Sequence, residues 1–119
     1  VNLHAFPEVV MKHFGQRFLY LYEPVPMGEF ATTELVGSLF PGEDLVVMNG
    51  DTITDIDFKS VCHGVSQRFI SHKTGCHMGA SFLTADQNHE PPQDTVVDCE
   101  YFDCGTPETL QIARKHYEH

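Results

Sequence analysis

Leu45-Val46-Val47-Met48-Asn49-Gly50-Asp51-Thr52 is the stretch that decides the predicted fold. Its first half is an unbroken apolar run that ends in turn residues, which is typical of a strand buried on both faces of a sheet. Asn49 and Gly50 tolerate the unusual backbone angles of a tight exit from such a strand. That exit would hold Asp51 beyond the carboxyl end of a parallel strand, where open α/β sheets bind their ligands. The alternative is a plain strand and turn, since Asn-Gly and Gly-Asp are common turn pairs.

The length and charge of the chain limit what it can bind. At 119 residues the sequence predicts one domain, spanning 1–119, with a single core. There are 17 acidic residues and only 7 lysines and arginines, so a cationic stripe for nucleic acid is lacking and we expect no nucleic-acid partner. An enzyme of this charge that binds phosphates depends on metal ions, helix N-termini and backbone amides.

Apolar segments and cysteines bear on where the protein works. No apolar run approaches membrane-spanning length, and no basic-then-apolar leader precedes the first predicted helix, so we expect no membrane partner. The four cysteines are Cys62, Cys76, Cys99 and Cys104. Without a leader, we expect reduced thiols in a cytoplasmic protein; a disulfide stays open, although nothing in the spacing demands one.

Hydrophobic periodicity predicts alternating helices and strands. The strand over 18–22, the helix over 29–40 and the strand over 45–48 form a unit whose strands should be parallel, with a right-handed crossover. This order predicts an α/β fold. The other expected elements are a helix over 6–15, a helix over 55–71, a strand over 79–84, a loop over 85–98, a strand over 99–102 and a helix that begins at Thr106 and Pro107.

The helix predicted over 55–71 runs from about Asp55 to Ser71. Asp55 or Asp57 is expected to be its N-cap, although both could instead add to a metal cluster. Gly64 weakens the middle of the helix. Its apolar face consists of Phe58, Val61, Cys62, Val65, Phe69 and Ile70, which makes Cys62 a buried and inert thiol.

Three stretches, taken in this order, resemble one enzyme family. They are Val1-Asn2-Leu3-His4 leading to Pro7-Glu8 and a helix, Tyr22-Glu23-Pro24-Val25-Pro26-Met27-Gly28 followed by Leu45–Thr52, and Tyr101-Phe102-Asp103-Cys104-Gly105-Thr106-Pro107-Glu108. They fall at both ends and in the middle of the chain. The family that they resemble is the sugar-phosphate nucleotidyltransferases, the NDP-sugar pyrophosphorylases such as mannose-1-phosphate guanylyltransferase.

The resemblance implies a Rossmann-like α/β fold, a parallel sheet with helices on both faces, that is incomplete relative to the family. The family begins with a strand and a Gly-rich loop bearing Arg and Lys, and this chain has no such loop. The family's long sugar-binding section is replaced here by the short stretch between Thr84 and Cys99. We therefore expect a truncated or minimal member, whose missing first strand leaves an exposed edge that favours a homodimer.

The resemblance also implies a reaction and a set of site residues. The family joins a nucleoside triphosphate (NTP) to a sugar 1-phosphate and releases pyrophosphate. Asp51 and Asp103 match the two aspartates that share a divalent metal, usually Mg²⁺, so they are the expected catalytic and metal-binding residues. Mg²⁺ binds through one or two protein carboxylates plus substrate phosphates, which suits such a pair. The expected nucleotide-binding residues are Gly28, Glu23, Asn49 and Gly50.

Alternatives from other classes stay open. Cys62-His63 and Cys76-His77, with His72 between them, offer zinc ligands, although the spacing matches no common zinc module. A cysteine activated by His63 or His77 would be a nucleophile. The remaining alternative is a non-catalytic α/β module that dimerises or completes a partner protein.

Overall fold

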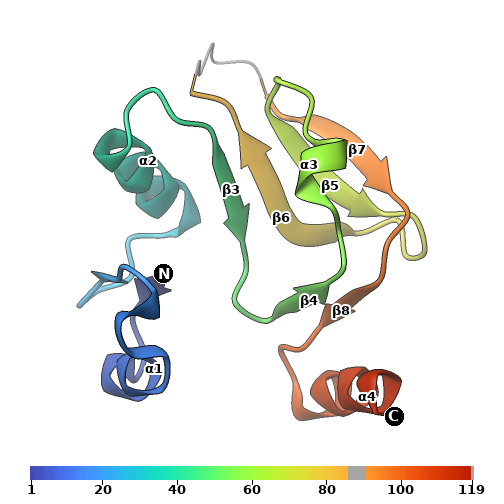
Figure 1. Cartoon of the computed structure of the whole chain (residues 1–119), viewed down its shortest axis with the longest axis horizontal. Helices are drawn as coiled ribbons and strands as arrows, with labels where there is room; N and C mark the ends of the chain where they lie inside the picture. The colour runs from blue at the N-terminus through green and yellow to red at the C-terminus, as the bar shows by residue number, and fades with distance from the viewer. Residues whose placement is uncertain (86–90, 119) are drawn as a thin grey trace. The chain divides into compact units, whose positions relative to one another are not determined.

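The computed structural model describes residues 1–85 and 91–118, and Figure 1 shows its helices and strands. The chain forms two compact units, Val1–Leu39 and Phe40–His119, which we call unit 1 and unit 2. Each unit has strands of its own. That the whole of 1–119 acts as one domain stays a prediction.

Unit 1 consists of two α-helices and a small parallel sheet. The first helix begins at Pro7, whose fixed φ suits the first turn, and ends at Gly15, whose φ of 59° favours glycine. The predicted ends of this helix are thus confirmed. Residues 23–28 form the loop that their prolines predicted. The elements are β1 (Asn2–Leu3), α1 (Pro7–Phe14), the 3₁₀ turn η1 (Gly15–Arg17), β2 (Leu21–Tyr22) and α2 (Glu29–Leu39), and β1 pairs parallel with β2.

Unit 2 is built on a four-stranded sheet with the order β3-β6-β5-β7 (Figure 1). The strands are β3 (Leu45–Met48), β5 (Gln67–Ser71), β6 (His77–Leu83) and β7 (Gln93–Val97). β6 pairs antiparallel with β3 and with β5, whereas β7 pairs parallel with β5. The predicted α/β class is confirmed, but the sheet is mixed where the sequence predicted parallel strands throughout.

β3 differs from its prediction in burial. It lies at one end of the sheet of unit 2, and Val46 and Met48 are 46% and 48% exposed. Leu45 and Val47 are less exposed, so the strand alternates between an inner and an outer face. The prediction of a strand buried on both faces is wrong, because a run of four apolar residues fits either pattern.

A second, two-stranded sheet of unit 2 joins β4 (Thr52–Thr54) to β8 (Tyr101–Asp103) in antiparallel fashion. α4 (Pro107–Tyr117) follows β8. The Thr106 hydroxyl accepts a hydrogen bond from the Thr109 N–H (3.1 Å) and the Thr109 hydroxyl accepts one from the Thr106 N–H (3.1 Å), which forms a capping box. The predicted start of α4 is therefore confirmed. No helix in residues 1–85 or 91–118 is long and apolar enough to cross a membrane.

The core of unit 2 lies on one face of the four-stranded sheet. α3 (Phe58–Val61), a single turn in front of β5 in Figure 1, places Phe58 against Phe69 with ring centroids 5.9 Å apart. Gln67 is also fully buried, and its amide makes three hydrogen bonds, so its burial leaves no polar atom unpaired. The buried apolar cluster consists of Phe69, Met78, Ala80, Phe82 and Val97.

The predicted helix over 55–71 is wrong beyond its first turn. The backbone becomes extended at Cys62, and Gly64 takes a φ of 74°, which a helix cannot contain. Residues 67–71 then form β5, whose inward positions include the polar Gln67 and Ser71. Because these two buried residues are polar, the apolar pattern shows a helical spacing where the structure has a strand.

The predicted loop over 85–98 is wrong in its second half. Residues 86–90 lie outside the described part of the chain. Gln93–Val97 forms β7, which runs alongside β5 in register from one end to the other. Pro91 and Pro92 precede this strand and do not interrupt it, so they leave its hydrogen bonds intact.

Candidate functional site

Two aspartates far apart in the sequence meet at the end of the β4–β8 ladder. Asp103 pairs with Thr52, the residue after Asp51, and the Cys104 N–H donates to the Asp51 carbonyl (2.7 Å). A Cβ placed on Gly105 would lie 3.0 Å from Asp51 Oδ2 and 3.0 Å from Asp103 Oδ1. The two carboxylate oxygens are therefore at most twice that distance apart and face one small space, which stays open because residue 105 is glycine.

The carboxylates of this pair contribute to the raised pKa of a neighbouring phenol, that of Tyr101. Burial raises the pKa of Tyr101, and the nearby carboxylates of Asp103 and Asp51 raise it further, followed by Cys76. Asp103 Oδ1 also accepts a hydrogen bond from the Gly105 N–H (2.9 Å), which fixes one of the facing oxygens. The Asp51 and Asp103 side chains are exposed, so a charged ligand has free access to them.

At the end of the β4–β8 ladder, the described residues provide two carboxylates as possible metal ligands, those of Asp51 and Asp103. Across 1–85 and 91–118, no group of three or more His, Cys, Asp or Glu side chains is placed to hold a metal ion. A structural zinc site needs four ligands, so the Cys-His pairs do not build one in the described residues. Mg²⁺ takes one or two carboxylates and completes its shell with water and phosphate oxygens, and the Asp51–Asp103 pair fits that requirement.

Cys62 is not an activated nucleophile in the structure. All four are free, and Cys62 packs against the core of unit 2. Burial raises the pKa of the Cys62 thiol, and the charge of Asp44 raises it further. A raised pKa keeps a thiol protonated and unreactive, so the prediction of an inert Cys62 agrees with its surroundings.

Asn49 and Gly50, chosen because they tolerate unusual backbone angles, lie in the turn before Asp51, but neither takes a positive φ there. The left-handed residue is Gly79 of β6, with a φ of 70°. A Cβ on Gly79 would lie 2.8 Å from Asn49 Nδ2 and 2.9 Å from Thr52 Oγ1. The turn is therefore shaped by the close approach of β6, a contact that no sequence pattern around Asn49 indicates.

Gly28 and Glu23 belong to unit 1. Gly28 has a φ of 91° and lies directly before α2, where a left-handed residue favours glycine. Glu23 is buried, and its carboxylate accepts hydrogen bonds from the Thr32 hydroxyl and from the Met27 N–H (3.0 Å). Both oxygens of Glu23 thus hold the loop to the first turns of α2, and direct nucleotide binding by either residue stays a prediction.

The pH dependence of unit 1 tests this role of Glu23. The hydrogen bonds from Thr32 and Met27 lower the pKa of Glu23 below its ordinary value of 4.5. Because the folded-state pKa is lowered, the stabilisation is fully present above pH 4.5 and is lost as the pH falls through the folded-state value. We expect acid to lower the hydrogen-exchange protection factor of the Met27 amide, which corrects the exchange rate for its intrinsic pH dependence, and Glu23→Gln to weaken this loss. Glu34→Gln, at an exposed position of α2, should leave it unchanged.

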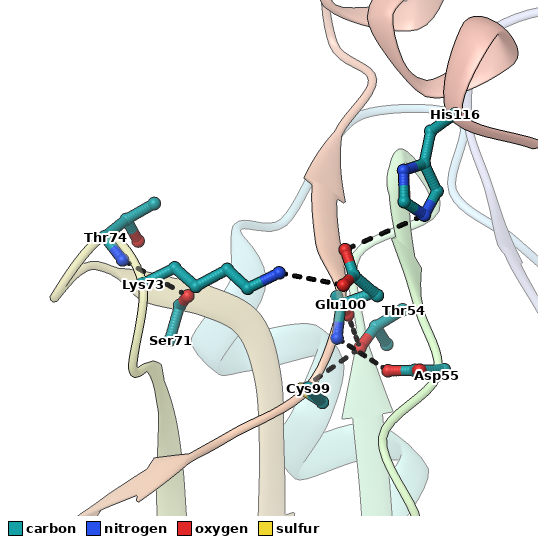
Figure 2. Close-up of polar contacts among 8 residues, drawn as sticks. All are labelled: Thr54, Asp55, Ser71, Lys73, Thr74, Cys99, Glu100 and His116. Atoms are coloured by element: carbon teal, nitrogen blue, oxygen red, sulfur yellow. Dashed lines mark hydrogen bonds and ion pairs between the residues drawn. The ribbon is translucent and has the colours of Figure 1, made fainter.

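Glu100, Lys73 and His116 form a network that the sequence did not indicate (Figure 2). Glu100 Oε1 pairs with Lys73 Nζ (2.8 Å), and Glu100 Oε2 lies 3.8 Å from His116 Nε2. Its partners come from the β5–β6 turn and from α4, too far along the chain for any local spacing rule. Asp55 accepts from the Glu100 N–H (2.7 Å), and Asp57 is the N-cap of α3, so one of the two predicted caps is confirmed.

No model of a known protein family matches the chain, and no curated protein matches it. Several solved structures match the chain. HddC from Yersinia pseudotuberculosis aligns with a TM-score of 0.74 and 14% identity over 98% of this chain and 77% of HddC. HddC complexed with GMP-PN aligns with a TM-score of 0.76 and 14% identity over 98% of this chain and 76% of that one. A "putative glucose-1-phosphate thymidylyltransferase" from Bacillus anthracis, in complex with sucrose, aligns with a TM-score of 0.70 and 12% identity over 92% of this chain and 71% of that one. The chain therefore has a nucleotidyltransferase-like α/β fold.

Proposed function

We propose that the chain binds the phosphates of an NTP through a Mg²⁺ held by Asp51 and Asp103, for transfer of the nucleotidyl group to a sugar 1-phosphate. The observation that supports this is the small space at Gly105 that both carboxylates face. The fold agrees with it, since similar structures contain GMP-PN and sucrose. The excess of acidic residues agrees too, because with so few cationic side chains the phosphates need a metal ion.

In the proposed reaction an oxygen of the sugar 1-phosphate attacks the α-phosphorus of the NTP. The bond from the α-phosphorus to the bridging oxygen breaks, and pyrophosphate leaves with that electron pair. When bound, Mg²⁺ neutralises charge on the phosphates during such a displacement. Asp51 and Asp103 would hold the ion through their carboxylate oxygens, and the Gly105 N–H keeps the Asp103 carboxylate turned toward the shared space.

The nucleotide-binding roles of Gly28, Glu23, Asn49 and Gly50 belong to the same proposal. The glycine at 28 leaves its surroundings open, with no atom within 4 Å of a Cβ built there, so a ligand can approach this backbone closely. Glu23 supports the loop through its own hydrogen bonds. The surroundings of Gly50 are equally open, whereas the side chain of Asn49 packs against Gly79.

Gly105→Ala tests the metal site without altering either carboxylate. The added methyl group would lie 3.0 Å from both oxygens, in the space proposed for the ion. We expect the affinity for Mn²⁺, a spectroscopic substitute for Mg²⁺, to fall about tenfold, measured by the EPR signal of free Mn²⁺. Gly50→Ala is the matched control for this titration, which contains no nucleotide, since a Cβ there meets nothing within 4 Å. Equal Mn²⁺ binding by wild type and Gly105→Ala would contradict the site.

Pyrophosphate release from mixed NTPs and sugar 1-phosphates tests the reaction itself. The chain contains no Gly-rich loop with Arg and Lys, so we expect binding of Mg²⁺-NTP but only slow release by this chain alone. Slow release that disappears in Asp51→Asn supports the assigned reaction. Release that is unaffected by this substitution would show that the carboxylate pair is not the catalytic site.

A second candidate function is favoured by the exposure of β3. Val46 and Met48 lie half exposed on a strand at one end of the sheet of unit 2, and such margins pair readily with other chains. A non-catalytic module that dimerises or completes a partner would use this margin. Light scattering distinguishes a monomer from a homodimer. A protein that stays monomeric at high concentration would contradict the homodimer.

A further inference from the structure

The register of a short ladder decides whether the two site aspartates meet. β4 and β8 pair over three residues each, and an isolated two-stranded ribbon is marginally stable. A slip of one residue would turn every side chain of β8 to the opposite face and move Asp103 away from Asp51. The candidate site therefore depends on whatever holds this ladder at its two ends.

Hydrogen bonds hold the ladder at both ends. Next to the carboxylates, the Cys104 N–H donates to the Asp51 carbonyl (2.7 Å). At the far end, the contacts converge on Glu100, the residue before β8 (Figure 2). Its N–H donates to Asp55 Oδ1 (2.7 Å), and its carbonyl accepts from the Thr54 hydroxyl (2.6 Å) and from the Asp55 N–H (3.4 Å). We call this set of contacts the Glu100 clamp.

The side chain of Glu100 ties the clamp to the rest of unit 2. Lys73, in the turn between β5 and β6, donates to Glu100 Oε1 (2.8 Å), and this contact raises the pKa of Lys73. His116 of α4 lies 3.8 Å from Glu100 Oε2, and its ring lies 4.9 Å from that of Phe102 in β8. The strand that carries Asp103 is thus held at Glu100 from the main sheet and from α4, while Asp55 supplies a side-chain acceptor to the Glu100 N–H.

We infer that Asp55 is a positioning residue for the Asp51–Asp103 pair, because its bond to the Glu100 N–H fixes the register that brings the two carboxylates together. The inference adds a positioning residue to the proposed metal site. Its test by Mn²⁺ binding therefore rests on the proposed function. The register itself can be followed without metal, through the Cys104 amide that bonds Asp51.

Asp55→Ala and Asp55→Asn form a matched pair of variants. Both remove the same charge, but only Asn keeps an oxygen that accepts from the Glu100 N–H. We expect Asp55→Ala to weaken Mn²⁺ binding about tenfold and to remove hydrogen-exchange protection of the Cys104 amide, with Asp55→Asn close to wild type. Thr54→Val, which is isosteric and uncharged, should act in the same direction as Asp55→Ala because it removes the bond to the Glu100 carbonyl.

Three results would overturn the inference. The first is an equal loss of Mn²⁺ affinity in Asp55→Ala and Asp55→Asn, since charge and not the acceptor would then be responsible. The second is a loss of protection across β5 and β6 together with Cys104, which would make Asp55 a general folding residue. The third is unchanged Cys104 protection in Asp55→Ala. Failure of the wild type to bind Mn²⁺ would refute the proposed function, and the Cys104 amide would then decide the inference by itself.

Discussion

Asp51→Asn is expected to weaken Mn²⁺ binding by about 100-fold, because losing an outer-shell partner of a metal ligand already costs about 10–100-fold and Asp51 is assigned as a direct ligand. The substitution keeps the shape of the side chain and removes one of the two negative charges that face the space at Gly105. Asp103→Asn should have an effect of similar size, because the two oxygens are equally far from that space. Both variants are measured by the Mn²⁺ EPR titration used for Gly105→Ala.

The stability of the metal-free protein separates this effect from unfolding. Two exposed carboxylates so close together repel each other, so Asp51→Asn should leave the free energy of unfolding unchanged or raise it by about 0.5 kcal/mol. Binding and stability would then move in opposite directions. Asp98→Asn, at an exposed position before β8, removes the same charge away from the pair and is the control. Loss of binding in the Asp98 variant as well would indicate a general effect of charge.

Gly79→Ala is expected to produce the largest loss of stability, about 2–5 kcal/mol. An alanine at a φ of 70° costs about 1–2 kcal/mol in backbone energy. Its Cβ would also lie 2.8 Å from Asn49 Nδ2 and 2.9 Å from Thr52 Oγ1, and overpacking of this kind costs about 1–3 kcal/mol. The free energy of unfolding in urea measures the sum, which is a large part of the stability of a typical domain.

Gly75→Ala separates the two contributions. Gly75 has the same φ of 70°, but a Cβ there meets no atom within 4 Å. It should therefore lose only the backbone part, and the difference between the variants measures the contact of β6 with the turn before Asp51. If Gly79→Ala destabilises the protein no more than Gly75→Ala, the close approach to Asn49 is not a real constraint. A true constraint would also lower Mn²⁺ affinity in Gly79→Ala, since the turn carries Asp51.

The contrast between α4 and β5 shows which parts of the fold the sequence could predict. The start of α4 depends on Thr106 and its near neighbour Thr109, so the capping signal is local and the prediction is confirmed. β5 was predicted as part of a helix, because its apolar residues continue a helical spacing from Phe58 onward. Its inward positions include Gln67, which is buried only because Val61, His63 and Thr95 supply hydrogen bonds.

The same distinction between local signals and contacts distant in the chain applies to the candidate site. The sequence by itself determined that Asp51 and Asp103 follow short apolar segments and turn signals, because those signals depend on neighbouring residues. Only the tertiary structure decided that their carboxylates share one space, that Gly79 shapes the turn before Asp51, and that Glu100 holds the strand of Asp103. The physical reason is that strand register and close approach are set by partners distant in the chain, whose hydrogen bonds and volumes exist only once the chain has folded.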